Sequence, residues 1–275
     1  MTILIIGGSG LLGTELIRQA AAAEHTTAAT FVTRPGSIAQ VAWHALDLRH
    51  PEQLEAVVAE VAPRLIINAT SGGPDWAVTA EGPIRVAMAA VRHGCRLVHV
   101  SSDAVFSGTR VHYDESCLPD PVTPYGAAKA AAETGVRLVA SDAVIARTSL
   151  IIGDLRSPHV QLVHDLSAGT RNGVLFTDDI RCPVHVTDLA AALLELALGE
   201  SNGVHHLAGA DAVSRHELGI LIAERDGLDA SRLPVGLRAD TLLPGALDVR
   251  LNSRTTQHRL HTTLRGARQF LSRRA

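Results

Sequence analysis

The sequence predicts an α/β fold, with a doubly wound parallel sheet and a smaller, discontinuous lobe in the C-terminal part. Short apolar runs alternate with longer Ala- and Leu-rich segments through the first half of the chain. The strand-like runs are continuously apolar, as expected of parallel strands covered by helices on both faces. Apolar residues make up 46% of the chain and aromatic residues 3%, which suits aliphatic strands packed against Ala- and Leu-rich helices.

The elements of the first half follow in order. Strands are expected at 2–7, 27–34, 64–70, 96–106 and 142–153, and a short apolar piece ends at 48. Helices are expected at 11–23, 51–61 and 81–94, and a fourth helix carries residues 125–129. Pro51 stands at the start of its helix and Gly94 closes another, as such residues commonly do. Beyond about residue 153 the alternation loosens, which predicts the smaller lobe.

Composition excludes several classes of protein. The net charge is −3 and the arginines are scattered, so nucleic acid is not an expected partner. Cys95, Cys117 and Cys182 are far apart and show no C-x-x-C spacing, which indicates a reducing compartment. The 14 histidines form no metal-ligating pattern, so no metal is expected. With no signal-like N-terminus and no apolar run of membrane length, the sequence predicts a cytoplasmic protein that is not membrane-bound.

The basic C-terminal tail has a structural interpretation. Leu260, Leu264, Ala267 and Leu271 recur at helical spacing. Such a stripe predicts a terminal helix that docks by its apolar face and exposes its arginines to solvent. We therefore expect a docked helix here rather than a nucleic-acid-binding arm.

The glycine pattern after the first strand predicts a phosphate-binding loop. Gly7, Gly10 and Gly13 form a G-x-x-G-x-x-G sequence between a strand and a helix. Such glycines allow a tight turn, close approach of a pyrophosphate and close packing of helix on strand, in a Rossmann-like fold. We expect a dinucleotide-binding domain over 1–153, completed by part of 182–208, and a substrate-binding lobe over most of 154–275.

The end of the second strand indicates which dinucleotide binds. NAD sites usually have a carboxylate there that binds the ribose 2′-hydroxyl. This strand instead ends in Thr33 and Arg34. A guanidinium suits a 2′-phosphate, so NADP(H) is favoured over NAD(H), although an ordinary surface arginine would look the same.

Lys129 is the only lysine among the 25 Lys and Arg residues, and it follows Tyr125 at the i+4 position. A helix places two such residues on one face. A free phenol titrates near pH 10, and a nearby ammonium lowers that pKa and prepares the hydroxyl for general acid or base catalysis. Chance placement beside one of the two tyrosines is a poor explanation.

Ser102 is the third candidate catalytic residue. It lies toward the end of the strand expected at 96–106, and the carboxyl ends of parallel strands usually carry site residues. Its hydroxyl can stabilise negative charge that develops on a substrate carbonyl oxygen. Taken alone, a serine in this place would be read as the cap of a turn.

Together these features resemble the extended short-chain dehydrogenase/reductases, and most of all the RmlD (dTDP-4-dehydrorhamnose reductase) family. The stretches that carry the resemblance are GGSGLLG, SSDAVFSG, YDESCLPDPVTPYGAAKAAAE, RTSLIIG, PVHVTDLA, GVHHLAG and LDVRLNS. The resemblance implies that Tyr125 is the proton donor, that Lys129 tunes it and anchors the ribose, and that Ser102 polarises the carbonyl. It implies further cofactor contacts by Leu11, Leu12, Asp47, Leu48, Ala69, Thr70 and Ser71.

The substrate side is less well defined. Asp103, Val105 and Arg181 are expected there, although Arg181 could equally belong to an Asp–Arg surface network. Related dehydratases have Asp-Glu after the serine or threonine, whereas Asp103 precedes Ala104, which argues against dehydration. The short loop TSGGPDW and Leu150, where the family often has tryptophan, leave the identity of the substrate open.

The resulting hypothesis is an NADPH-dependent ketoreductase whose small-molecule substrate is a nucleotide sugar or a related ketone. Two alternatives remain. One is a non-catalytic NADP-binding regulatory subunit, although such a protein has no need of a tuned phenol. The other is an epimerase, which returns the hydride to its substrate. The oligomeric state is open, including a homo-oligomer.

Overall fold

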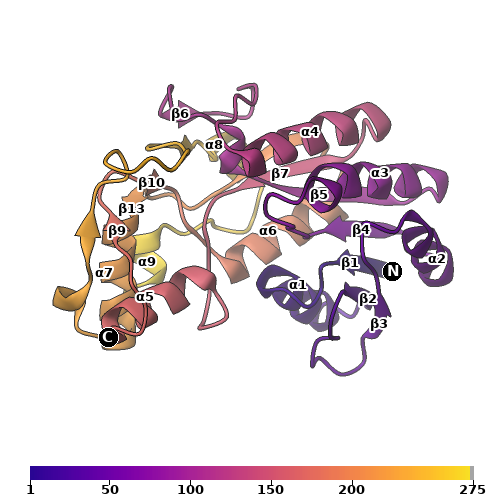
Figure 1. Cartoon of the computed structure of the whole chain (residues 1–275). Helices are drawn as coiled ribbons and strands as arrows, with labels where there is room; N and C mark the ends of the chain where they lie inside the picture. Colours follow the sequence, from indigo (N-terminus) through magenta and orange to yellow (C-terminus); the bar gives the residue numbers. More distant parts are fainter. Residues whose placement is uncertain (273–275) are drawn as a thin grey trace.

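The computed structural model describes residues 1–272, and its centre is a parallel sheet of seven strands in the order β12-β7-β5-β4-β1-β2-β3 (Figure 1). The strands are β1 (Thr2–Ile6), β2 (Thr26–Phe31), β3 (Ala42–Ala45), β4 (Leu65–Asn68), β5 (Arg96–Ser102), β7 (Val144–Thr148) and β12 (Gly203–Leu207). The strand order reverses between β1 and β4, which is where sheets of this kind bind ligands. The predicted fold class is confirmed.

Helices cover both faces of this sheet (Figure 1). One face carries α1 (Leu11–Ala22) and α6 (Val186–Leu198), and the other carries α2 (Pro51–Val61), α3 (Gly82–Arg92) and α4 (Pro124–Val139). Alternate strand residues enter the two cores: Ile3 and Ile5 pack with α1, and Leu4 and Ile6 pack on the opposite face. Burial on both faces explains why the strands are continuously apolar.

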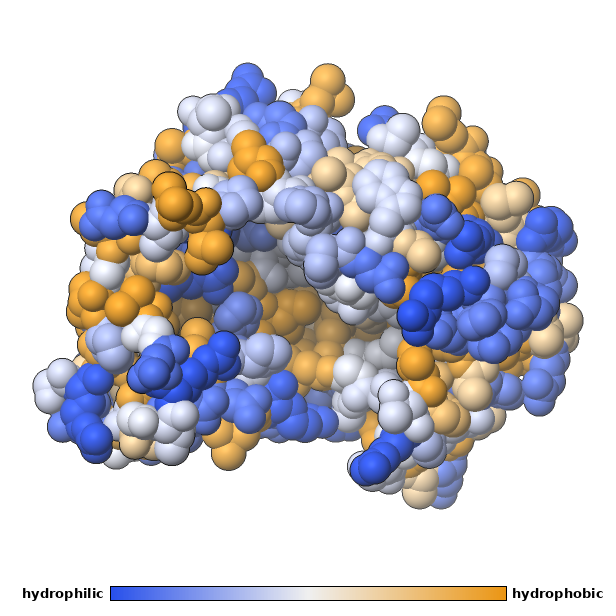
Figure 2. Space-filling view, in the orientation of Figure 1, coloured by the Kyte–Doolittle hydropathy of each residue, from blue (hydrophilic) through white to orange (hydrophobic). Residues whose placement is uncertain are grey.

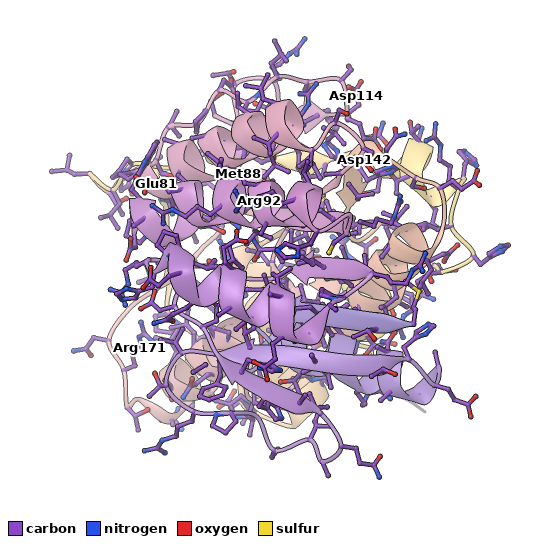
Figure 3. The ribbon with its side chains drawn as sticks, turned by 90° about the vertical axis from the view of Figure 1, so that its right-hand side faces the viewer. Glu81, Met88, Arg92, Asp114, Asp142 and Arg171 are labelled. Atoms are coloured by element: carbon purple, nitrogen blue, oxygen red, sulfur yellow. The ribbon has the colours of Figure 1, made fainter. Side chains whose placement is uncertain are left out.

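An ion pair at the surface connects two of the outer helices, α2 and α3. Arg92, which Figure 3 labels with Met88 of the same helix, α3, and with Glu81, the residue that precedes this helix, forms an ion pair with Glu55 of α2. Within residues 1–272, no helix has the length and the apolar character required to cross a bilayer.

A smaller lobe lies beside the carboxyl edge of the sheet. Its core includes Val160, Leu175 and Ile222, and α6 and β12 interrupt it in sequence because they return to the large sheet. Its elements and the short ones around them are η1 (Ala77–Glu81), η2 (Asp103–Val105), β6 (His112–Tyr113), β8 (Ile151–Ile152), α5 (Pro158–Ala168), β9 (Leu175–Phe176), β10 (Ile180–Arg181), β11 (Val184–His185), β13 (Val213–Ser214), α7 (Arg215–Asp226), η3 (Ala230–Arg232), β14 (Val235–Gly236), β15 (Arg250–Leu251), α8 (Arg254–Gln257) and α9 (Ala267–Phe270).

Two expected strands end early. The strand expected at 96–106 stops at Ser102, because the serine side chain accepts the Ala104 N–H and starts the 3₁₀ turn η2. The strand expected at 142–153 divides into β7 and β8, and β8 pairs with β11 instead of continuing in the large sheet. Both breaks face the smaller lobe, where the chain has to leave the sheet.

The prediction of a single docked helix in the tail is wrong. Two short helices, α8 and α9, are separated by a non-helical segment. Glu195 of α6 accepts the backbone N–H groups of His261 and Thr262 at 2.6 and 3.0 Å, so a side chain replaces the helical partners. Leu264, Ala267 and Leu271 are nevertheless buried. Residues 273–274 of the expected helix lie outside the described residues.

Candidate active site

The glycine loop has the geometry that the sequence predicts. Gly7 has φ +84°, in the left-handed region that favours glycine, and its N–H donates to Thr30 Oγ1 at 3.1 Å. A Cβ on Gly13 would lie 2.2 Å from the Gly7 carbonyl oxygen, so only glycine permits this helix–strand packing. Gly10 precedes α1, whose start has no side-chain cap. The free N–H groups of that helix end fit the pyrophosphate of a dinucleotide.

A groove of about 490 Å³ opens next to this loop, outside the carboxyl ends of β1, β2 and β4. Figure 2 shows this face hollowed between the side of the central sheet and the side of α5 and α7. The groove is lined by six of the expected cofactor residues, namely Gly7, Arg34, Asp47, Leu48, Thr70 and Ser71. Leu11 and Ala69 pack against the core and Leu12 is buried in it, so these side chains do not line the groove.

The groove also contains a charged pair that the sequence analysis missed. Arg49 contacts both carboxylate oxygens of Asp47, with its terminal nitrogen 2.6 Å from Oδ2. This contact lowers the pKa of Asp47 to about 2. The spacing DLR in the sequence was the available signal. Arg34 is exposed and has no ion-pair partner within residues 1–272, so its guanidinium is available to a ligand.

The start of α4 places Tyr125 beside Ser102. Thr123 caps the helix, accepting the Gly126 N–H at 3.0 Å, and Pro124 follows at the first helical position. A Cβ on Gly126 would lie 2.1 Å from the Ala104 carbonyl oxygen, so the helix packs directly on η2. The Tyr125 hydroxyl lies near the side chains of Ser71 and Ser102, and both favour its ionised form.

Gly126→Ala is expected to lower the stability by about 2 kcal/mol and to reduce activity, because the new methyl group forces α4 away from η2. Gly135→Ala on the same helix is the matched control, since its methyl group meets only the Ile84 side chain, which can rotate. Chemical denaturation of both variants measures the difference. Equal stabilities for the two variants would show that the contact with η2 is dispensable.

The pKa of Tyr125 moves in the opposite direction to the one expected. Burial raises it, and the Asp103 charge adds to the increase, while the hydrogen bonds to Ser71 and Ser102 oppose it. The Lys129 ammonium instead donates to the carbonyl oxygens of Val100 at 3.0 Å and Thr70 at 3.3 Å. Burial lowers the pKa of Lys129 to about 8. Lys129 is thus a buried cation held at the start of the loop that carries Ser71.

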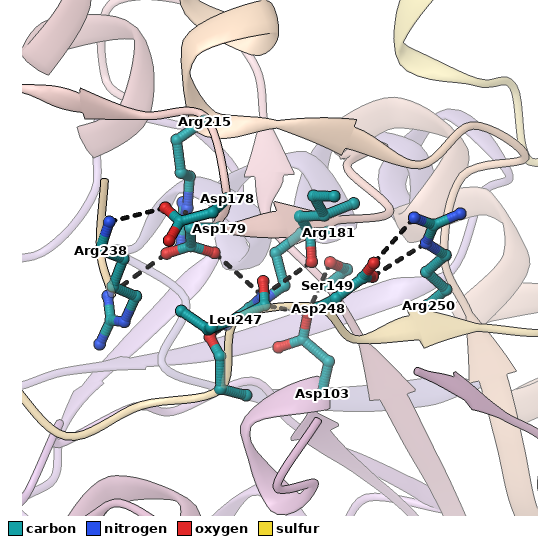
Figure 4. A network of polar contacts seen from close by, with 12 residues as sticks. Asp103, Ser149, Asp178, Asp179, Arg181, Arg215, Arg238, Leu247, Asp248 and Arg250 are labelled. Atoms are coloured by element: carbon teal, nitrogen blue, oxygen red, sulfur yellow. Dashed lines mark hydrogen bonds and ion pairs between the residues drawn. The ribbon is translucent and has the colours of Figure 1, made fainter. Parts of the chain in front are cut away.

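Ser102 both caps a turn and faces the phenol. Its Oγ accepts the Ala104 N–H at 3.1 Å and donates to Asp103 Oδ1 at 3.2 Å. The other oxygen of Asp103 accepts the Ser149 hydroxyl at 2.7 Å. Asp103 therefore connects Ser102 to the segment that leads into the smaller lobe, and Figure 4 shows its contact with Ser149.

The two other expected substrate residues, Val105 and Arg181, are buried, as Asp103 is. The Val105 side chain is fully buried in a cluster with Phe106 and Tyr113. Arg181 is buried, 2.9 Å from Asp179 and bonded to the carbonyl oxygens of Ala246 and Leu247 (Figure 4). The structure therefore favours the alternative interpretation of Arg181, an Asp–Arg network, although the network is buried and not on the surface.

The same network contains two arginines that the sequence analysis missed. Arg215 and Arg238 lie 3.4 and 3.3 Å from Asp179 Oδ2. They come from segments far from Asp179 in sequence, and no local motif marks them.

Comparisons with known proteins agree with this geometry. The sequence matches the family described as "RmlD substrate binding domain" over residues 1–244. The chain is 28% identical over 263 residues to the probable low-salt glycan biosynthesis reductase Agl14 of Haloferax volcanii, covering 90% of this chain and 87% of that protein. It is 29% identical to dTDP-4-dehydrorhamnose reductase of Mycobacterium tuberculosis over 245 residues, covering 84% of this chain and 77% of that protein.

The fold is similar to that of dTDP-4-dehydrorhamnose reductase from Bacillus anthracis in complex with NADP. The TM-score is 0.84 at 22% sequence identity, with 98% of this chain and 96% of that chain covered. The family match over most of the chain, together with the glycine loop and the Ser–Tyr–Lys arrangement, leads to one conclusion. This chain belongs to the RmlD substrate-binding domain family and is an NAD(P)H-dependent oxidoreductase of the extended short-chain dehydrogenase/reductase type.

Proposed function

We propose that the protein is an NADPH-dependent reductase of a keto-sugar nucleotide or a related biosynthetic ketone, with Tyr125 as the proton donor. The observation that carries the proposal is the position of Tyr125: the first turn of α4 packs on the η2 turn that Ser102 begins, and Tyr125 also lies near Ser71 of the cofactor groove. The named relatives are reductases of glycan or sugar-nucleotide biosynthesis, which supports this class of substrate.

The residues divide the chemistry as follows. NADPH, when bound, supplies the hydride. Tyr125 gives its hydroxyl proton to the substrate carbonyl oxygen as negative charge develops there, and its raised pKa keeps the phenol protonated at neutral pH. Ser102 turns its hydroxyl from Asp103 toward the same oxygen and stabilises the charge. Lys129, bonded to the carbonyl oxygens of Val100 and Thr70, holds a buried positive charge one helical turn from Tyr125 and at the start of the loop that carries Ser71.

The proposal is tested by the loss of reduced-nicotinamide absorbance with a panel of keto-sugar nucleotides and simple ketones. Turnover of one substrate class, with the corresponding alcohol as product, supports the reductase. Interconversion of two sugars without net NADPH oxidation would identify an epimerase instead. Tight NADPH binding without turnover on the panel would favour the regulatory subunit.

Arg34→Ala is expected to weaken NADPH binding by about 10-fold or more and to leave NADH binding unchanged. The reason is that a charge-assisted contact to a 2′-phosphate contributes roughly 1.5–3 kcal/mol. Fluorescence titration with both cofactors measures the change. Arg18→Ala is the control, because Arg18 is an exposed arginine of α1 that is paired with Glu15 and does not line the groove. Equal losses for NADPH and NADH would assign Arg34 no role in selecting the 2′-phosphate.

A further inference from the structure

A buried carboxylate lies one helical turn beyond Lys129. Tyr125, Lys129 and Glu133 are spaced at i, i+4 and i+8 along α4, so they share one face of the helix. Lys129 and Glu133 are each 2% exposed. The groove residues do not include Glu133, and a carboxylate at this depth requires a reason because burial disfavours charge.

Glu133 is fixed by two strands of the central sheet. Ser101 of β5 donates to Glu133 Oε1 at 2.6 Å. Arg147 of β7 contacts both oxygens, with Nε 3.0 Å from Oε1 and Nη2 2.8 Å from Oε2. Arg147 is 1% exposed, donates to the Cys117 carbonyl at 3.0 Å and lies over the Phe106 ring. The carboxylate therefore cannot rotate away from the Lys129 face.

The surroundings of Lys129 contain little other negative charge. Its ammonium contacts two backbone carbonyls, from β5 and from the loop after β4. His99 of β5 is fully buried, and burial together with the Lys129 charge holds its pKa well below the usual value, so it is neutral. The Asp103 charge raises the pKa of Tyr125. The Glu133 charge raises the pKa of Lys129 and so opposes the lowering that burial causes.

We propose that Glu133, held by Ser101 and Arg147, is a positioning residue that keeps Lys129 protonated and directed at the loop beneath the active site. The importance of Glu133 for catalysis rests on the proposed function, whereas its effect on the protonation of Lys129 does not. Arg147 of β7 offsets part of the carboxylate charge, but Glu133 lies one helical turn from Lys129 and is the charged group that acts on it.

The chain's composition permits a direct test, because Lys129 is its only lysine. Protein labelled with ¹³Cε-lysine and carrying a lysine-free tag gives a single side-chain NMR signal, whose shift against pH reports the Lys129 titration. Glu133→Gln is expected to lower the midpoint by about 0.5–1 pH unit, the effect of removing a charge roughly 6 Å away in a partly screened site. Glu60→Gln removes an exposed carboxylate and is expected to leave the midpoint unchanged.

Glu133→Gln leaves Arg147 buried without its partner, which is destabilising. A second variant therefore keeps the test decisive if Glu133→Gln fails to fold. Glu133→Gln/Arg147→Met removes both charges, and its midpoint is expected to fall between those of the wild type and Glu133→Gln. Wild-type midpoints in the folded variants would overturn the proposal and reduce Glu133 to a structural partner of Arg147.

The pH profile of turnover separates this inference from the proposed function. If the reductase activity is present, the alkaline limb of kcat is expected to move with the NMR midpoint in each variant. A limb that stays in place while the NMR midpoint shifts would overturn the link to catalysis. If the wild type reduces no substrate, the proposed function fails, and the NMR titration alone decides the role of Glu133.

Discussion

Tyr125→Phe is expected to reduce kcat for ketone reduction by about 10³-fold, because general acid catalysis contributes roughly 10²–10⁴-fold. The substitution removes only the hydroxyl, which lies near Ser71 and Ser102, and the ring remains to fill its place. NADPH affinity is therefore expected to stay within about twofold of the wild type, since the free energy of a lost neutral hydrogen bond is modest. Stopped-flow hydride transfer and fluorescence titration measure the two quantities.

The second tyrosine of the chain provides a matched control. The Tyr113 hydroxyl accepts the backbone N–H groups of Gly108 and Arg110 at 2.9 and 3.1 Å, and its ring stacks on Phe106. Tyr113→Phe is expected to lose about 1–2 kcal/mol of stability and to retain kcat. Similar kcat values for Tyr125→Phe and the wild type would show that Tyr125 is not the proton donor.

Lys129→Met is expected to abolish the rise in stability that the wild type shows between about pH 8 and pH 10.5. The folded-state pKa of Lys129 is about 8, below its ordinary value of 10.5. Between these values the unfolded chain binds more protons than the folded chain, so the free energy of unfolding increases with pH. Below pH 8 both states are protonated and the full cost of burying the ammonium, on the order of 3 kcal/mol, is present.

Denaturant unfolding at a series of pH values measures this effect, and the difference between wild type and Lys129→Met removes the contribution of other groups. Turnover of Lys129→Met is expected to fall sharply at every pH, because the substitution removes the buried positive charge that holds the start of the Ser71 loop, one helical turn from Tyr125. Parallel stability profiles for the two proteins would show that Lys129 is not a strained, buried cation in the fold.

Features with local causes were readable from the sequence. The left-handed Gly7 and the close contact at Gly13 follow from a strand–turn–helix segment of a few residues. Tyr125 and Lys129 share a face because the helical repeat alone places residues i and i+4 together. The continuous apolar strands predicted a sheet buried on both sides, and the sheet is buried in this way.

Features that depend on residues distant in the sequence could not be predicted from it. The sequence left Arg181 open between a substrate contact and an Asp–Arg network, and the structure shows Asp179 and two carbonyl groups around its guanidinium. The sequence indicated a tuned phenol but not that burial raises its pKa. The tail had helical spacing, but Glu195 satisfied its backbone instead.

The sequence by itself determined the layered fold, the phosphate loop and the pairing of Tyr125 with Lys129, because backbone periodicity and glycine sterics act over a few residues. Only the tertiary structure decided which charges meet, as when Glu133 of α4 finds Arg147 of β7 and when Asp103 finds Ser149. Ion pairs and burial depend on where distant segments come together in space, and a desolvated group takes whichever partner the packing brings within reach.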